Sequence, residues 1–257
     1  MSMIDFSTDG PVAVIKLNRP PVNALSEAFA GDILEAVERC ESDSFRAVMI
    51  YGDPLFSVGA DIKGFKKRLE STEEVDPDAA RTLLFAIGKM EQLEKPVLAA
   101  IKGFALGGGF ELAMGADFRY AAEGARMGQP EILLGLIPGG GGTQRLARLI
   151  GSQKARLLTY TGMQVDAARA LELGMVDRVF PDDEVVEKTM ESCQKMAKRP
   201  TLAIAAAKKA INEGYGLTIE EGLKVEAAEF QSVFVSKDAS EGVDAFINKR
   251  EATFTGE

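Results

Sequence analysis

Short apolar runs alternate with helix-period segments between residues 10 and 122, and this alternation constrains the fold of the chain more than any other feature. The apolar runs have the length of strands and end at turn residues, whereas the segments between them repeat apolar residues every three or four positions. We expect strands at residues 12–17, 45–51, 97–101 and 118–121. The pattern predicts the α/β class with largely buried strands, and taken alone it suggests an ordinary parallel sheet.

Helical patterns dominate after about residue 127. The expected helices are 143–150, 152–160, 166–173, 184–198, 202–213, 219–235 and 239–249. Pro200 marks the expected boundary between an α/β core, residues 1–199, and a helical tail, residues 200–257. The tail carries more apolar side chains than two or three helices can bury alone. We therefore expect it to pack on the core, on another subunit, or on both.

The chain contains no histidine. This absence excludes Ser-His-Asp and Cys-His catalysis, histidine-ligated zinc and a histidine general base. Cys40 and Cys193 are isolated thiols that fit a reducing compartment and form no metal motif, so no metal site is expected. Acid–base chemistry at neutral pH must therefore come from Asp, Glu, Lys, Tyr or Cys with a shifted pKa.

Charge and motif checks exclude several classes of function. The net charge of −9 argues against nucleic acid or an anionic membrane surface as the main partner. The longest uncharged stretch, residues 132–144, is shorter than the ~20 residues of a membrane span. The N-terminus shows no targeting pattern, so a cytoplasmic protein is expected. Both glycine clusters fail the nucleotide-binding pattern G-x-G-x-x-G, because Leu112 and Gln144 stand where its last glycine is needed.

Two glycine-containing turns are suited to binding an oxyanion. Residues 107–109 are three glycines between a buried strand and the start of a helix, where free backbone N–H groups and the helix dipole favour negative charge. The turn at Gly59 and Ala60 follows another strand and offers a second N–H group. Two such donors on one carbonyl oxygen would stabilise an enolate or a tetrahedral oxyanion.

Two glutamates in apolar sequence contexts are candidates for proton transfer. Glu111 precedes Leu112, and Glu131 precedes Ile132. Burial in such surroundings raises the pKa of a carboxyl group towards the range useful for catalysis. A pair of these groups could hold one water molecule and divide the roles of base and acid. The alternative is structural, since glycine-rich turns are often only turns and a glutamate at a helix start is often a cap.

These segments, in this order, resemble the enoyl-CoA hydratase/isomerase (crotonase) family over almost the whole chain. The resemblance implies an α/β spiral of ββα units in two near-perpendicular sheets, with a C-terminal helical region that builds homotrimers, often paired as hexamers. It rests on Asn18-Arg19-Pro20, Asn23-Ala24-Leu25, Gly59-Ala60-Asp61-Ile62, Lys95-Pro96-Val97, residues 103–111, Gln129-Pro130-Glu131, Ile137-Pro138-Gly139, residues 142–146, residues 168–176, Phe246 and Lys249-Arg250.

The resemblance also implies an activity and the residues for it. The N–H groups of Ala60 and Gly108 would hold the thioester oxygen of an acyl-CoA, and that of Gly139 would help to place a water molecule. Glu111 and Glu131 match the two glutamates of the hydratases. The implied reaction is the reversible hydration of a trans-2-enoyl-CoA to a 3-hydroxyacyl-CoA, with no cofactor because coenzyme A is part of the substrate.

Further residues are assigned to the coenzyme A part of the substrate by the same resemblance. Val58, Ala60, Asp61 and Ile62 lie in the segment that contacts coenzyme A. Lys63 either meets a phosphate or is a solvated surface lysine. Phe246 and Lys249 would reach coenzyme A in a neighbouring subunit.

Two regions depart from the family pattern. Phe110 stands where small residues or cysteine are common, which would narrow or redirect the acyl pocket. The polar stretch 63–78 borders the acyl site in the family and is expected to be a helix-like, solvated face.

Two other functions stay open at this point. One is an enoyl-CoA isomerase that uses chiefly Glu131; Glu111 argues against it, although bifunctional members exist. The other is a non-catalytic member that binds acyl-CoA or RNA. The negative charge argues against RNA, and the two retained glutamates argue against an inactive protein.

Overall fold

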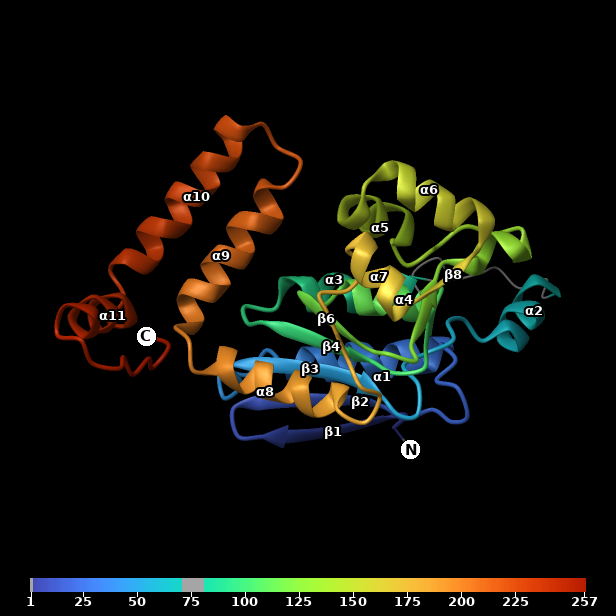
Figure 1. The fold of residues 1–257 in the computed structure, drawn as a ribbon, viewed down its shortest axis with the longest axis horizontal. Coiled ribbons are helices and arrows are strands. Elements are labelled where there is room, and N and C mark those ends of the chain that lie inside the picture. Colours follow the sequence, from blue (N-terminus) through green and yellow to red (C-terminus); the bar gives the residue numbers. More distant parts are fainter. Residues whose placement is uncertain (1, 71–80) are drawn as a thin grey trace.

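The computed structural model describes residues 2–70 and 81–257, and its centre is a six-stranded sheet (Figure 1). The strand order is β1-β2-β3-β4-β6-β9, with β1 antiparallel to β2 and the other neighbours parallel. The strands are β1 (Ile4–Asp9), β2 (Val12–Leu17), β3 (Ala47–Gly52), β4 (Val97–Ile101), β6 (Phe118–Ala122) and β9 (Arg178–Phe180). Strands β2, β3, β4 and β6 confirm the four predicted from apolar runs.

A second, three-stranded sheet carries part of the candidate site. It consists of β5 (Phe104–Leu106), β7 (Arg126–Gly128) and β8 (Gln164–Asp166), with β5 parallel to β7 and β7 antiparallel to β8. These strands, and β9 in the first sheet, were missed by the sequence analysis, which expected helices to dominate after residue 127. Three residues are too few to show the alternation of a strand. The single parallel sheet that the apolar pattern alone suggested was therefore wrong, whereas the α/β fold with two sheets that the resemblance implied is confirmed.

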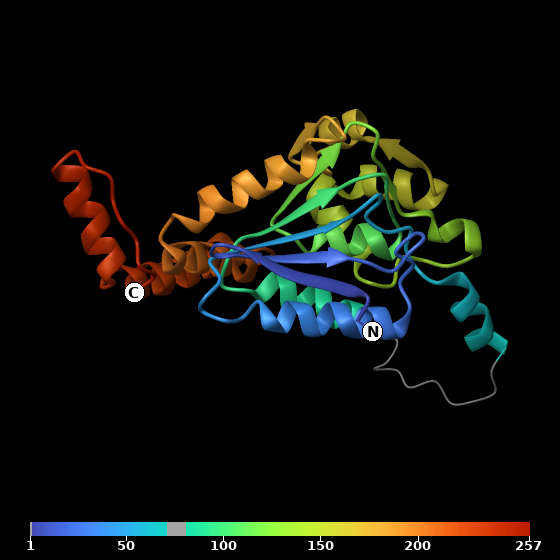
Figure 2. The same ribbon diagram turned by 90° about the horizontal axis from the view of Figure 1, so that it is seen from below.

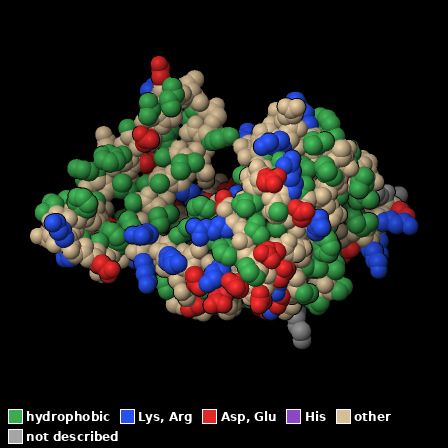
Figure 3. Space-filling view, in the orientation of Figure 1, with side chains coloured by type: hydrophobic (Ala, Val, Ile, Leu, Met, Phe, Trp, Pro, Cys, Tyr) green, Lys and Arg blue, Asp and Glu red, His purple; other side chains and the backbone are tan. Residues whose placement is uncertain are grey.

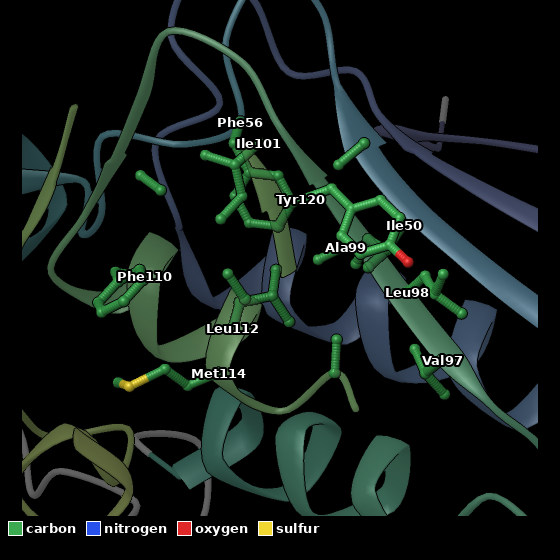
Figure 4. Close-up of a cluster of buried hydrophobic side chains, with 14 of the residues drawn as sticks. Ile50, Phe56, Val97, Leu98, Ala99, Ile101, Phe110, Leu112, Met114 and Tyr120 are labelled. Atoms are coloured by element: carbon green, nitrogen blue, oxygen red, sulfur yellow. The ribbon is translucent and has the colours of Figure 1, made fainter. Parts of the chain in front are cut away.

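Helices cover both faces of the large sheet. Figure 2 shows α1 (Glu27–Arg39) and α3 (Thr82–Gln92) along one face and α8 (Val185–Ala197) along the other. The sequence predicted α1 from its apolar stripe and its N-cap, and Ser26 does accept a hydrogen bond from the N–H of Phe29. Between these layers lies a core in which every residue of β4 is buried (Figure 4).

Four short helical segments and a single turn of 3-10 helix surround the small sheet. They are α4 (Gly108–Met114), η2 (Pro130–Leu134), α5 (Gly142–Ile150), α6 (Ser152–Thr161) and α7 (Ala167–Leu173). Helix α4 is fully buried from Gly109 to Met114, and Phe110 is a core residue with no exposed surface (Figure 4). The α5, α6 and α7 helices lie within two residues of their predicted bounds.

The last three helices form an arm that extends from the core (Figure 1). They are α9 (Thr201–Gly214), α10 (Ile219–Phe234) and α11 (Lys237–Ile247). Hydrophobic side chains are plentiful on the visible face of this arm (Figure 3), and Phe230, Phe234 and Phe246 are 62%, 68% and 85% exposed. A cleft of about 1020 Å³ separates α9 and α10 from α3 and α5. The division of the chain at residues 199 and 200 stays a prediction.

The polar stretch that the sequence analysis expected to be helix-like is only partly described. Helix α2 (Ile62–Glu70) covers its beginning, and Lys66 and Glu70 form an exposed i,i+4 ion pair. Residues 71–80 lie outside the described residues. Within the described ranges, no helix has the length and apolar character needed to cross a membrane. Those same ranges contain no cluster of three or more acidic or cysteine side chains arranged for a metal.

Candidate active site

The two glycine-containing turns predicted to bind an oxyanion lie against each other. Ser57 forms a parallel bridge with Ala105, and the N–H of Leu106 donates to the carbonyl of Ser57 at 3.0 Å. Gly59 has a φ of +88°, and a Cβ atom there would lie 2.6 Å from the carbonyl oxygen of Leu106 and 3.3 Å from the nitrogen of Gly108. Only glycine allows this conformation and this close approach. The structure thus brings Ala60 and Gly108 together from segments about 50 residues apart in the chain.

The N–H groups of Ala60 and Gly108 are left free by their local structure. Ala60 forms a parallel bridge with Leu25 in which the carbonyl of Gly59 and the N–H of Asp61 make the hydrogen bonds. In a parallel pair the residue between these two groups directs its own N–H to the opposite side. Gly108 is the first residue of α4, where an N–H has no partner within the helix. Among the described residues neither N–H group has a hydrogen-bond partner outside its own element, so both donors are available to an acceptor.

Glu111 lies one helical turn after these donors and is 2% exposed. Its Oε1 accepts hydrogen bonds from the N–H groups of Gly140 at 2.8 Å and Gly142 at 2.7 Å. Burial raises the pKa of the Glu111 carboxyl, while these two hydrogen bonds and the positive charge of Arg145 oppose the rise. A Cβ at position 140 would lie 2.7 Å from Oε2 of Glu111, so the turn approaches the carboxylate closely because it is made of glycine.

Glu131 approaches the same place from η2. A Cβ at Gly107, whose φ is +51°, would lie 2.9 Å from Oε1 of Glu131. Burial, and secondarily the negative charge of Glu111, raise the pKa of Glu131 to about 7. A Cβ at the next residue, Gly108, would lie 3.8 Å from Oε2 of Glu111, so the two carboxyl groups lie beside the same pair of glycines. Such a pair can hold a proton on one member near neutral pH while the other is ionised.

Gln129 and Arg145 were not among the predicted site residues. Gln129 is fully buried, and with its amide nitrogen turned to Glu131 it donates to the two carboxylate oxygens at 3.0 and 3.2 Å. Arg145 donates to the carbonyl of Gly140 at 2.9 Å and forms a two-point ion pair with Glu91, with both N–O distances 2.6 Å. Gln129 belongs to the segment Gln129-Pro130-Glu131 and Arg145 to the segment 142–146, but nothing local in either segment indicates these contacts.

The predicted coenzyme A residues of the first turn differ in exposure. Val58 is half-buried, whereas Ile62 and Lys63 are exposed. Asp61 is engaged with protein groups. It pairs with Arg19 at 2.8 Å and accepts from the N–H of Gly64 at 3.3 Å, and these contacts, led by that of Arg19, lower the pKa of Asp61. Asp61 therefore fixes the start of α2 rather than presenting a free carboxylate.

The structure does not bring Phe246, Lys249 or Gly139 into contact with the two glutamates. Phe246 is on α11 and Lys249 follows it, at the end of the molecule opposite α2 in both ribbon views (Figures 1 and 2). Gly139 is exposed, and the N–H groups that reach Glu111 are those of Gly140 and Gly142. The predicted role of Gly139 in placing water stays a prediction.

Comparisons with known proteins identify one family. A family model described as enoyl-CoA hydratase/isomerase matches residues 7–257. The chain is 39% identical to a protein named crotonyl-CoA hydratase from Syntrophomonas wolfei, over 95% of this chain and 94% of the relative. It is 37% identical to the mitochondrial enoyl-CoA hydratase of Pongo abelii, over 95% of this chain and 83% of the relative. The crystal structure of the enoyl-CoA hydratase from Bacillus anthracis superposes with a TM-score of 0.93 at 37% identity, covering 99% of this chain and all of that one.

Proposed function

The chain belongs to the enoyl-CoA hydratase/isomerase family and is an enzyme of that family, and on this premise we propose that it hydrates trans-2-enoyl-CoA thioesters reversibly to 3-hydroxyacyl-CoA. The observation that carries the proposal is that a buried carboxyl group, Glu111, and a partly buried one, Glu131, lie beside the turn that presents the backbone N–H groups of Ala60 and Gly108. A hydratase needs a base for water, an acid for the α-carbon and a site for negative charge on the thioester oxygen.

The N–H groups of Ala60 and Gly108 would bind the thioester oxygen. Addition of water to the β-carbon pushes electrons onto this oxygen, which then resembles an enolate. Donors already aimed at the oxygen stabilise that charge without reorganising, and loss of one such donor typically costs about 3–4 kcal/mol of barrier. Both donors belong to the backbone, so their positions are fixed by Gly59 and by the start of α4.

The environments of the two glutamates suggest a division of roles. Glu111 accepts two backbone hydrogen bonds and lies near Arg145, which favours its ionised form and suits it to activate water. Glu131 has a pKa raised to about 7 and retains a proton for delivery to the α-carbon. One ionised and one protonated carboxyl group are the starting state that hydration requires.

Hydration of crotonyl-CoA tests this proposal. We expect the purified protein to remove the absorbance of the conjugated enone, and Glu111→Gln and Glu131→Gln each to lower kcat by about 10²- to 10⁴-fold while coenzyme A binding persists. Glu123→Gln, in the exposed turn after β6, is the matched control and should retain full activity. Turnover near the wild-type rate in either site variant would contradict the assigned role. Isomerisation of a 3-enoyl-CoA without hydration would instead favour the isomerase.

A further inference from the structure

Arg145 links the glycine turn at residues 140–142 to helix α3. Its described hydrogen bonds reach neither Glu111 nor Glu131. Its guanidinium donates at 2.9 Å to the carbonyl of Gly140, whose own N–H donates to Glu111. Its other two nitrogens, Nε and Nη2, donate to the two carboxylate oxygens of Glu91, both at 2.6 Å. This fork-to-fork geometry fixes the plane of the guanidinium, which a single hydrogen bond would not do.

The turn that Arg145 holds has little stiffness of its own. Residues 139–142 are four consecutive glycines, and Gly141 has a φ of +98°. A Cβ at Gly141 would lie 2.0 Å from a guanidinium nitrogen of Arg145, so the guanidinium occupies the space beside the turn. Glycine loses more conformational freedom on ordering than any other residue. A four-glycine turn therefore needs an external contact to keep two N–H groups aimed at one carboxylate oxygen.

The charged groups around Glu111 single out the same residue. Helices α3 and α5 and strand β5 pack against α4, and β5 carries no charged residue. In α3, Lys89 pairs with Glu41 and Glu91 pairs with Arg145. In α5, the side chain of Arg148 donates to Gln144, and from η2 the site receives Glu131. Arg145 is thus the cation among these groups whose charge favours ionised Glu111, and it is itself paired with Glu91.

Resting on the proposed function, we propose that Arg145, held by Glu91, is a positioning residue that keeps the Gly140–Gly142 turn in place and the Glu111 carboxylate ionised. The residue acts through the turn and through its charge. Removing Arg145 should therefore loosen both N–H donors and favour protonated Glu111. Because ionised Glu111 is the base, activity at low pH should be lost first.

Three substitutions separate the position of the guanidinium from its charge. Arg145→Gln should lower kcat about 10- to 100-fold with KM changed less than about 3-fold, and should move the acidic limb of the kcat/KM profile to higher pH. Arg145→Lys keeps the positive charge but cannot make the two-point contact with Glu91. The acidic limb should therefore stay at the wild-type pH, and kcat should recover part of the loss seen in Arg145→Gln. Glu91→Gln leaves Arg145 positive but unclamped; kcat should fall without an upward shift of the limb.

Arg119→Gln is the matched control. Arg119 is more deeply buried than Arg145; it also donates to backbone carbonyls and lies near an aspartate, but it is bound to residues 116, 175 and 177. This variant should lose stability, but the acidic limb of its kcat/KM profile should stay at the wild-type pH. An unshifted limb in Arg145→Gln, with a loss of activity that follows the loss of stability as in the control, would overturn the proposal. Should Arg145→Gln not fold, wild-type kcat in Arg145→Lys or in Glu91→Gln would overturn it.

A second readout does not depend on the reaction. An infrared titration of the protonated carboxyl band, assigned by its loss in Glu111→Gln, follows the ionisation of Glu111 directly. Its midpoint should rise in Arg145→Gln and not in Arg119→Gln. If the protein hydrates no enoyl-CoA, this titration still tests the role of Arg145, so failure of the proposed function and failure of this inference are distinguishable.

Discussion

Glu131 shows how one residue gains reactivity at the expense of stability. The side chain is carried by a single turn of 3-10 helix, and burial together with the charge of Glu111 raises its pKa to about 7. In the unfolded chain the same carboxyl has an ordinary pKa near 4.5. The folded protein therefore binds this proton more tightly than the unfolded chain, and the associated stability is fully present below pH 4.5 and is lost as the pH rises through 7.

Glu131→Gln should accordingly stabilise the protein at alkaline pH. At pH 8 the wild type must hold an ionised carboxylate in a partly desolvated site, whereas the amide carries no charge. We expect a gain of about 1 kcal/mol at pH 8, after allowance for solvent screening, and a much smaller difference at pH 5. Denaturant unfolding at both pH values measures it, with Glu123→Gln as control. Equal stability of the variant and the wild type at pH 8 would show that burial of Glu131 carries no cost.

At the scale of the element, helix α9 is attached to the core by a lysine whose side chain is largely buried. Lys208 is 9% exposed at its side chain and pairs with Asp117 at 3.0 Å. It also lies 3.3 Å from the carbonyl of Lys95. Asp117 in turn accepts from the N–H of Val97 at 2.7 Å, at the start of β4. One side chain thus joins the first helix of the arm to a central strand of the sheet.

Lys208→Met should destabilise the protein more than removal of both partners. The single change leaves the Asp117 carboxylate partly buried without its cation, a kind of loss that typically costs about 3–5 kcal/mol for a fully buried pair and less here. In Asp117→Asn/Lys208→Met no uncompensated charge remains, and part of the stability should return. Unfolding of the two single variants and the double variant gives the coupling energy. A double variant as unstable as the sum of the single ones would show that the pair is not coupled.

At the scale of the whole molecule, the arm is too apolar to stand alone in water. Four apolar side chains on α10 and at its end are 52%, 62%, 68% and 84% exposed, namely Leu223, Phe230, Phe234 and Val235. The rings of Phe230 and Phe234 lie side by side, with centroids 5.6 Å apart. Exposed apolar patches of this kind usually mark an interface. We therefore keep the prediction of a homo-oligomer, a trimer or a dimer of trimers, in which Phe246 and Lys249 would reach the site of a neighbour.

Phe230→Asp/Phe234→Asp should break this assembly. Two charges in an apolar interface cost far more than they do in solvent, so we expect a smaller species than the wild type at micromolar concentration, measured by light scattering. Leu171→Asp, at an exposed leucine of α7 outside the arm, should leave the mass unchanged. A wild-type protein that is a stable monomer would contradict the predicted oligomer.

Much of the fold could be predicted from local sequence alone. The strands 12–17 and 97–101 were predicted with their observed bounds, and α1 was predicted together with its Ser26 cap. The reason is that the apolar stripe of a helix repeats about every 3.6 residues, while a strand buried on both faces is a continuous apolar run, and both signals are visible in a short window. Strands β5, β7, β8 and β9 have three residues each and carry no such signal. Phe110, expected near the acyl pocket, is a core residue, because its direction depends on how α4 packs.

The sequence by itself determined which groups are available for chemistry: no histidine, two glutamates in apolar contexts, and glycines at two turns that follow strands. Tertiary structure decided that Gly59 lies against Gly108, that Gly140 and Gly142 donate to Glu111, and that Arg145 is clamped by Glu91. Residue type and helical period are local properties, so a single chain reveals them. The contacts join segments 29 to 54 residues apart, and only the packing of β5, α3, α4 and α5 fixes them.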